Sequence, residues 1–555
     1  MRNPASENKN PTIFNTPMEK IALFLILMYS LTVSAQEELL TTAERTNYEA
    51  TSTYEEVMQF IESLESQSPY IRSATIAQSI EGRDIPLMII GNPLPSGPEE
   101  LANDDRIVVY LQGNIHAGEV EGKESTQMIA RELLKKPESD ILKQVIVLIN
   151  PILNADGNEK FSTENRTNQN GPSSVGIRYN GQNLDLNRDA MKLETPEIRG
   201  LVENVLDRWD PALLVDCHTT NGSYHEEPTT FVWMMNPNGD RSLINYMRDD
   251  MMQQVHITLR DKYQVENVFY GEFIDRLDYS KGWISYAAEP RFLVNYVGLR
   301  NRLAILNENY VYADFKTRVN ASYHLLLTIL EYAAANRQEI KDLINSADQR
   351  ALNPDNKQVQ DSFAVTYEGR PTPEKITIKA IEADTIPGVT GYWRFKQSDR
   401  KVTVTVPYIA DYYPVVSRKI PSAYLMTVME PEIIDLLTSH GITVEKLNQP
   451  VTLQVEQFTI SELNGTRRLF QGHYTNEVKG SFEIVEKTFP AGTYLIRTDQ
   501  KLRHLAVYLL EPEADDGLLH WNFFDRYLVP QWGGGFYPYP VYRLMESKTL
   551  KTSGI

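Results

Sequence analysis

Short apolar runs typical of buried β-strands alternate with helical segments through the first 345 residues of this 555-residue chain. The clearest runs are RIVVYLQ (106–112), QVIVLIN (144–150), ALLVDC (212–217) and LAILN (303–307). Between the first two lies EGKESTQMIARELLKK (121–136), a stretch of good helix formers that Pro137 follows. Because strands that alternate with helices form βαβ units, the sequence predicts an α/β domain over residues 36–345, with a mostly parallel central sheet flanked by helices.

The end of this domain is predicted near residue 345. A last helical segment covers 318–344, and the polar stretch 346–362 after it has no periodic apolar face, which is typical of a linker. Beyond it come β runs separated by turn residues, namely KVTVTVPYIA (401–410), VTLQVEQFTI (451–460), GSFEIVEKTF (480–489) and GTYLIRT (492–498). We therefore predict a β-rich C-terminal domain over residues 363–555, with one helical piece at 431–441.

The N-terminal residues have the pattern of a secretory signal peptide. A basic residue precedes the apolar stretch IALFLILMYSLTV (21–33), and a V-S-A sequence then ends at Ala35. This stretch is shorter than the roughly 18 residues that a membrane span needs, and no second long apolar stretch follows. We therefore predict a signal peptide over 1–35, with Met1 or Met18 as the start, and a secreted or periplasmic mature chain with no membrane span.

Charge and cysteine content exclude several kinds of partner and site. The net charge of -19 opposes binding to phosphate backbones, so no nucleic-acid partner is expected. The single cysteine, Cys217, rules out an internal disulfide and any zinc site built on two or more cysteines. Since side chains alternate along a strand, Cys217 is expected to point away from the face that its neighbour His218 uses.

Residues able to bind a metal follow the predicted strands. His116 and Glu119 come directly after the first run, His218 follows ALLVDC, and Glu308 follows LAILN. In open parallel sheets, sites gather at the carboxyl ends of the strands, so these side chains are expected to lie together. Two histidines and one carboxylate leave the fourth position of a tetrahedral zinc ion free for water, as in catalytic zinc sites. A further carboxylate beside that water can take its proton.

The order of these motifs resembles that of the zinc carboxypeptidases. In that family an H-x-x-E pair and a later single histidine bind one zinc ion, and the matching residues here are His116, Glu119 and His218. The stretch QSIEGRDIPLMIIG (78–91) is similar to the leading S-x-x-G-R-x-I strand of the family. The resemblance covers about residues 50–345 and implies the zinc carboxypeptidase fold, with one Zn²⁺ as cofactor.

The stretch LDLNR (184–188) resembles the D-x-N-R segment of the same family. By this match Asn187 and Arg188 bind the terminal carboxylate of the substrate, the arginine through a two-pronged, charge-assisted contact. Asp185 would orient the first zinc histidine without binding the metal itself. Glu308 falls where the family keeps its general base.

Two further roles follow from the resemblance. The tyrosine that caps the substrate corresponds to Tyr286, in GWISY, with Tyr296 as the alternative. The arginine that stabilises the oxyanion has no counterpart at its expected place, which holds Asn170. Arg166 and Arg178 are the nearest candidates for that role.

The function that this resemblance implies is a zinc metallocarboxypeptidase. Its substrates would be peptides or proteins with a free C-terminus, and Glu308 would activate a zinc-bound water against the last peptide bond. Two alternatives use the same fold, an amidase of murein peptides and a deacylase of N-acyl amino acids. A further hypothesis is a non-catalytic binding protein. It is disfavoured because the set of metal ligands and the general base are both present.

Overall fold

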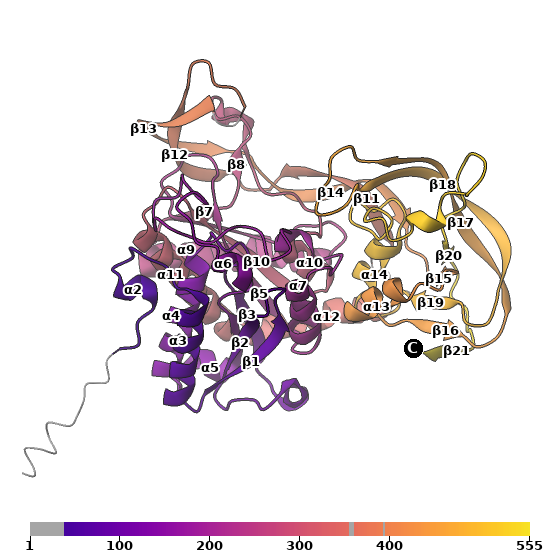
Figure 1. Cartoon of the computed structure of the whole chain (residues 1–555), viewed down its shortest axis with the longest axis horizontal. Coiled ribbons are helices and arrows are strands. Elements are labelled where there is room, and N and C mark those ends of the chain that lie inside the picture. The colour runs from indigo at the N-terminus through magenta and orange to yellow at the C-terminus, as the bar shows by residue number, and fades with distance from the viewer. Residues whose placement is uncertain (1–37, 354–359, 392–393) are drawn as a thin grey trace, which may run out of the picture. The chain divides into compact units, whose positions relative to one another are not determined.

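The computed structural model describes residues 38–353, 360–391 and 394–555 (Figure 1). The predicted signal peptide, 1–35, lies outside the described residues. Thr41–Ile555 form one compact unit, in which we distinguish a first half (residues 41–353) and a C-terminal half (residues 360–555). None of the helices in the described part of the chain combines the length and the apolar content that a membrane crossing requires.

An eight-stranded mixed sheet lies at the centre of the first half. Its strand order is β1-β2-β4-β3-β5-β10-β6-β7, and the neighbours from β4 to β10 all run parallel, which confirms the predicted α/β class. The antiparallel pairs are β1–β2, β2–β4 and β10–β6. The strands are β1 (Ile71–Gln78), β2 (Asp84–Ile90), β3 (Ile107–Gln112), β4 (Val145–Asn150), β5 (Leu213–Thr220), β6 (Thr229–Trp233), β7 (Asn267–Phe269) and β10 (Leu303–Tyr310).

Helices cover both faces of this sheet (Figure 1). Strands β3, β4 and β5 are buried along their whole length, which explains why they read as continuous apolar runs. The helices are α2 (Thr42–Arg45), α3 (Tyr54–Gln67), α4 (Glu121–Lys135), α5 (Asp140–Gln144), α6 (Ala155–Asn158), the 3₁₀ turn η2 (Leu186–Arg188), α7 (Pro196–Leu201), α8 (Arg241–Tyr246), α9 (Met252–Tyr263), α10 (Leu293–Leu299), α11 (Phe315–Ala335) and α12 (Arg337–Leu352).

The last helical segment of the first half differs from its prediction. It is two helices, α11 and α12, because α11 ends at Asn336, whose side-chain amide donates to the carbonyl of Tyr332 at 2.9 Å and whose backbone is not helical. The linker predicted over 346–362 begins inside α12. Asp348 is buried on that helix and pairs with Arg302 at 3.0 Å, so residues 346–352 pack on the first half.

The C-terminal half is rich in β-structure, as predicted. A seven-stranded sheet has the order β18-β17-β20-β15-β19-β16-β21, and β12 pairs with β13. The strands are β11 (Ser362–Pro371), β12 (Ile376–Thr385), β13 (Phe395–Val406), β14 (Tyr408–Lys419), β15 (Ala423–Met426), β16 (Glu445–Leu447), β17 (Val451–Gly465), β18 (Asn476–Phe489), β19 (Tyr494–Arg497), β20 (Val541–Leu544) and β21 (Thr552–Gly554), with helices α13 (Pro431–Ser439) and α14 (Arg503–Leu510).

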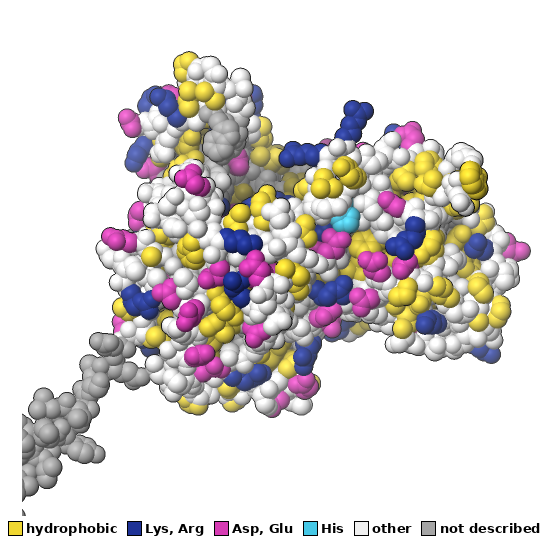
Figure 2. Space-filling view, in the orientation of Figure 1, with side chains coloured by type: hydrophobic (Ala, Val, Ile, Leu, Met, Phe, Trp, Pro, Cys, Tyr) yellow, Lys and Arg dark blue, Asp and Glu magenta, His cyan; other side chains and the backbone are white. Residues whose placement is uncertain are grey.

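The two halves share backbone structure. Strand β14 pairs with β11 of its own half and with β9 (Trp283–Ile284) of the first half, and β9 continues the sheet to β8 (Glu272–Phe273). Helix α14 contacts α10 next to the central sheet (Figure 1). On the face shown in Figure 2, acidic and basic side chains are interspersed.

Candidate active site

His116 and Glu119 lie in the turn between β3 and α4, at the carboxyl end of the parallel strands. This turn sits close against the sheet, since a Cβ atom at Gly122 would lie only 2.4 Å from Cβ of Cys217 on β5. Glycine at that position lets α4 begin directly over β5. The two side chains are consequently held beside β5, and they are only 3% and 4% exposed.

His218 and Glu308 lie on neighbouring strands. They are register partners in the parallel pair β5–β10, so their side chains are on the same face of the sheet. The strands run further than the sequence predicted, to Thr220 and Tyr310, and both residues are therefore within strands rather than just after them. Antiparallel pairing with β6 keeps the end of β10 extended.

The side chains of His116, Glu119 and His218 converge on one point. Nδ1 of His116 and Nδ1 of His218 lie 3.1 Å and 3.0 Å from Oε2 of Glu119, and the two nitrogens are 3.1 Å apart. Donor atoms around a tetrahedral zinc ion with bonds of about 2.0–2.1 Å are separated by about 3.3 Å, so these distances fit such an ion. Among the described residues, this is the group of three side chains with the spacing of metal ligands.

The opposite ring nitrogens of both histidines face buried carboxylates. Nε2 of His116 is 2.9 Å from Oδ1 of Asp185, and Nε2 of His218 is 2.8 Å from Oδ2 of Asp216. When Nε2 carries the hydrogen and donates it to a carboxylate, the lone pair of the neutral ring is on Nδ1. The lone pairs of the two Nδ1 atoms and of Oε2 of Glu119 then face one another. A cation bound among these three atoms relieves their mutual repulsion. The donor set therefore fits a zinc ion.

The charges around this trio act on its pKa values. Burial raises the pKa of Asp185, but His116 and Arg178 outweigh it and hold the pKa well below its ordinary value. Burial lowers the pKa of His218, but Asp216 and Glu119 outweigh it and raise the pKa well above its ordinary value. Surroundings that favour a positive charge on this imidazole also favour a bound cation.

Glu308 has an oxygen with no partner. Its Oε2 is buried and makes no hydrogen bond with any residue that the structure describes. Burial raises the pKa of Glu308 to about 8; Glu119 adds to this effect and His218 opposes it. A carboxylate with these properties beside a metal site is suited to accept and return a proton.

Asn187 and Arg188 are fixed by contacts on two sides. Oδ1 of Asp185 accepts a hydrogen bond of 3.0 Å from the amide of Asn187, which caps the turn η2. Oδ1 of Asn187 accepts a hydrogen bond of 2.9 Å from the amide of Leu293. The guanidinium of Arg188 lies 4.3 Å from the ring centre of Phe292. Both side chains are thereby held at the edge of the metal-ligand trio.

Of the two candidate tyrosines, Tyr286 lines the same cavity as the trio and Tyr296 does not. The hydroxyl of Tyr286 donates to Oδ1 of Asn295 at 3.2 Å, and its ring lines the cavity described below. Tyr296 is fully buried, with its hydroxyl 2.8 Å from Nδ1 of His440.

Both candidate oxyanion arginines reach Glu119. Arg166 Nη1 is 3.0 Å and Arg178 Nη1 is 3.4 Å from Oε1 of that carboxylate. Arg166 also donates to the carbonyl of Thr219 at 3.0 Å, and Arg178 forms an ion pair of 2.8 Å with Asp185. The two guanidinium groups thus lie beside the trio and carry positive charge to its edge.

All of the predicted site residues except Asp185 line one cavity of about 350 Å³. They are His116, Glu119, Arg166, Arg178, Asn187, Arg188, His218, Tyr286 and Glu308. The cavity wall also includes residues that the sequence did not indicate, namely Thr219, Thr220, Asn221, Gly222, Tyr270, Glu272, Phe292, Val294 and Leu306. The fold thus brings residues from distant parts of the first half to one cavity.

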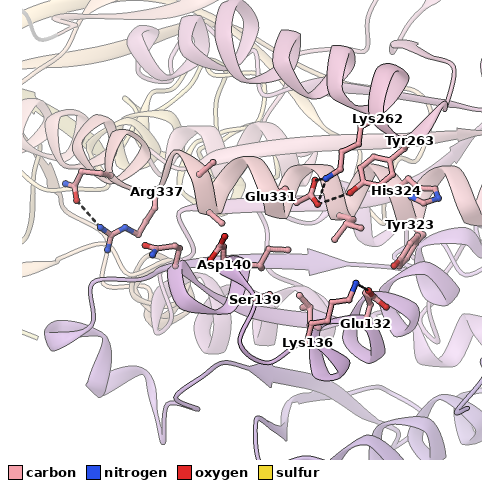
Figure 3. Close-up of a pocket in the computed structure, with 17 residues that line it drawn as sticks. Glu132, Lys136, Ser139, Asp140, Lys262, Tyr263, Tyr323, His324, Glu331 and Arg337 are labelled. Carbon is pink, nitrogen blue, oxygen red and sulfur yellow. Dashed lines mark hydrogen bonds and ion pairs between the residues drawn. The ribbon is translucent and has the colours of Figure 1, made fainter.

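A larger cavity, of about 1010 Å³, lies among α4, α5, α9 and α11 (Figure 3). Its charged groups neutralise one another, as Lys262 pairs with Glu331 at 2.7 Å and Lys136 with Glu132 at 2.6 Å. It holds none of the residues discussed above. The volume of a cavity is therefore not a sufficient criterion for locating the site. The convergence of titratable groups identifies the smaller cavity as the candidate active site.

Two of the residues that the sequence did not indicate contact the side chains of the candidate site directly. Asp216 stands two positions before His218 in the same strand, so period-two alternation puts both side chains on one face, and this signal was available. No sequence pattern indicates Phe292, because its contact with Arg188 depends on how the loop that carries it folds back to η2.

The chain is similar in sequence to known proteins. Residues 57–215 match the family model described as zinc carboxypeptidase. Carboxypeptidase 2 of Trichophyton rubrum is 23% identical over 484 residues, which is 84% of this chain and 81% of that protein. Carboxypeptidase 2 of Trichophyton equinum is 24% identical over 486 residues, with the same two coverages. Matches of this length extend into the C-terminal half.

Similar solved structures cover about half of the chain. A putative carboxypeptidase A from Shewanella denitrificans has a TM-score of 0.38 and 18% identity, covering 52% of this chain and 69% of its own. A metallo-carboxypeptidase from Pseudomonas aeruginosa has a TM-score of 0.38 and 16% identity, covering 52% of this chain and 70% of its own.

Proposed function

Because residues 57–215 of this chain belong to the zinc carboxypeptidase family, we propose that the protein removes amino acids from the free C-terminus of peptides. One observation carries this proposal: a single cavity is lined by a set of metal donors, by Glu308, and by the pair Asn187 and Arg188. A metal site, a proton acceptor and a carboxylate-binding pair are the three parts that such a reaction needs.

We assign His116, Glu119 and His218 as the ligands of one zinc ion. Asp185 and Asp216 hold the two imidazole rings in the orientation that turns Nδ1 toward the metal. When bound there, zinc polarises the scissile carbonyl and lowers the pKa of the attacking water.

Glu308 is the general base in this proposal. Its partnerless Oε2 takes a proton from the attacking water and then gives it to the amine that leaves. Arg166 and Arg178 supply positive charge for the oxygen that becomes negative as the carbonyl is attacked. Tyr286 closes the cavity over the substrate.

Asn187 and Arg188 bind the terminal carboxylate of the substrate. The guanidinium presents a planar pair of N–H donors that matches a carboxylate, and its stacking on Phe292 fixes its plane. This contact selects the last residue of a peptide chain, and it distinguishes an exopeptidase from an endopeptidase.

We further propose that the first half is the catalytic domain and that the boundary to the β-rich domain falls after α12. From the signal-peptide pattern we propose secretion or export to the periplasm, where the substrates would be peptides with free C-termini.

The test is release of amino acids from matched peptide libraries that have either a free or an amidated C-terminus. The expected result is release from the free acids only, lost with a chelator, restored by zinc and absent in Glu308→Gln. Hydrolysis of murein peptides or N-acyl amino acids in place of the free-acid peptides would refute a carboxypeptidase and support one of the two alternative activities. A zinc-loaded chain that cleaves none of these substrates would favour the binding protein.

A further inference from the structure

Three consecutive residues, Arg291, Phe292 and Leu293, connect the proposed carboxylate-binding pair to the rest of the protein. The amide of Leu293 donates to Oδ1 of Asn187 at 2.9 Å, and the ring of Phe292 lies 4.3 Å from the guanidinium of Arg188. This 291–293 segment therefore contacts both side chains of the proposed pair.

The 291–293 segment is held from the C-terminal half. Oδ2 of Asp516 accepts hydrogen bonds from the backbone amide of Arg291 at 2.9 Å and from its Nε at 3.0 Å. Arg291 Nη2 donates to the carbonyl of Asp515 at 3.0 Å. Asp516 is fully buried, so these are charge-assisted bonds shielded from water, which makes them stronger than their surface equivalents.

Two aromatic rings also contact the side chain of Arg291. Its guanidinium lies 5.5 Å from the ring centres of both Phe470 and Trp521, which come from different segments of the C-terminal half. A planar cation between aromatic rings and a buried carboxylate has little freedom to reorient.

A second contact from the C-terminal half reaches the other side of the pair. Oε1 of Gln471, in the turn between β17 and β18, accepts a hydrogen bond of 2.9 Å from the amide of Asp185. Asp185 caps the turn that carries Asn187 and Arg188. Close by, His473 pairs with Glu194 at 2.8 Å, which fixes the β17–β18 turn on the first half.

We propose that the C-terminal half completes the carboxylate-binding subsite, with Asp516 as a positioning residue that acts through Arg291 on Phe292 and Leu293. This inference rests on the proposed function, in which Asn187 and Arg188 bind the substrate carboxylate. The β-rich half is then part of the binding site for the peptide terminus, although Asp516 itself does not line the cavity.

The test compares Asp516→Asn with Asp348→Asn in the full zinc-loaded chain. Asp348 is a matched control, because it is also a buried aspartate paired with an arginine, Arg302, near the start of β10 and away from Glu308 at its other end. One readout is amide hydrogen exchange over the 291–293 segment. The others are kcat and KM for a blocked dipeptide with a free carboxylate, and inhibition by acetohydroxamate, which reports on the metal alone.

For Asp516→Asn we expect faster exchange in the 291–293 segment and a KM increased about tenfold, as for the loss of one charge-assisted contact, with kcat and acetohydroxamate inhibition within about twofold. Asp348→Asn should change none of these. Unchanged exchange and KM in Asp516→Asn, or an equal rise of KM in the control, would overturn the inference.

A milder variant, Arg291→Lys, provides a second test in case Asp516→Asn does not fold. It keeps the charge but loses the fork of donors, so we expect an intermediate rise of KM, and no change at all would count against the inference. If the wild-type chain cleaves no free-acid peptide, the proposed function fails. The exchange measurement then still decides whether Asp516 holds the 291–293 segment.

Discussion

Glu308 on β10 lies opposite His218 on β5, as register partners in two parallel strands. Because such partners point to the same face of a sheet, strand pairing by itself sets the proposed general base beside a proposed metal ligand. The separation of these two groups is thus fixed by backbone hydrogen bonds rather than by flexible loops. A site on paired strands keeps its geometry well, which is what proton transfer at a metal site requires.

Replacement of Glu308 by glutamine should abolish turnover while sparing the metal. Glutamine keeps the size of the side chain but cannot accept a proton, so kcat should fall by about 10²–10⁴. Metal analysis should still give about one zinc per chain, as expected for an intact three-ligand site. A variant that retains most of its activity would show that another group acts as the base.

Replacement of Asp216 by asparagine should weaken zinc binding. The carboxylate orients His218, and loss of such a contact typically costs about 10–100-fold in metal affinity. Competition with a chelator measures this, and excess zinc should restore activity. Cys217→Ala is the matched control, because Cys217 lies between these two residues but is buried on the opposite face of β5. Equal losses in both variants would point to damage to the strand instead.

Arg188→Lys should impair recognition of the substrate terminus. Lysine keeps the charge but loses the planar fork of donors and the stacking on Phe292, so KM for free-acid peptides should rise by roughly tenfold or more. Arg199→Lys, on α7 and paired with Asp435 at 2.9 Å, is the control and should leave KM unchanged. An unaltered KM in Arg188→Lys would remove this residue from the binding site.

Glu197 gives a prediction about stability and pH. It is fully buried on α7, and burial raises its pKa from 4.5 to about 7. The unfolded chain loses this proton at lower pH than the folded chain does, so the folded state loses stability as pH rises from about 4.5 to about 7. Glu197→Gln removes this penalty, which amounts to about 3 kcal/mol at most.

Thermal unfolding at several pH values measures the effect. The melting temperature of Glu197→Gln should exceed that of the wild type at about pH 8 and match it at about pH 4, where the carboxyl is largely protonated in both states. Glu203→Gln, at a partly exposed position close in sequence, is the control for the chemical change itself. A gain in Glu197→Gln of equal size at both pH values would contradict a raised pKa of Glu197.

Local patterns in the sequence were sufficient for the central strands and for the types of residue at the site. The apolar runs at β3 and β4 and the helix α4 were located to within a residue or two, because burial on both faces leaves a continuous apolar signal. The lengths of the strands were less well predicted. Strands β5 and β10 extend past the apolar runs, since pairing with neighbours continues through polar residues such as His218 and Glu308.

The sequence by itself thus determined the fold class, the β-rich second half and the chemical types of the candidate site, because those depend on periodicities and motifs only a few residues long. Only the tertiary structure decided that Phe292 lies under Arg188 and that Asp516 of the C-terminal half holds the 291–293 segment. Such contacts join side chains whose meeting depends on the packing of whole elements. A short-range sequence pattern does not specify which elements pack together, because their packing depends on the free energy of the complete fold.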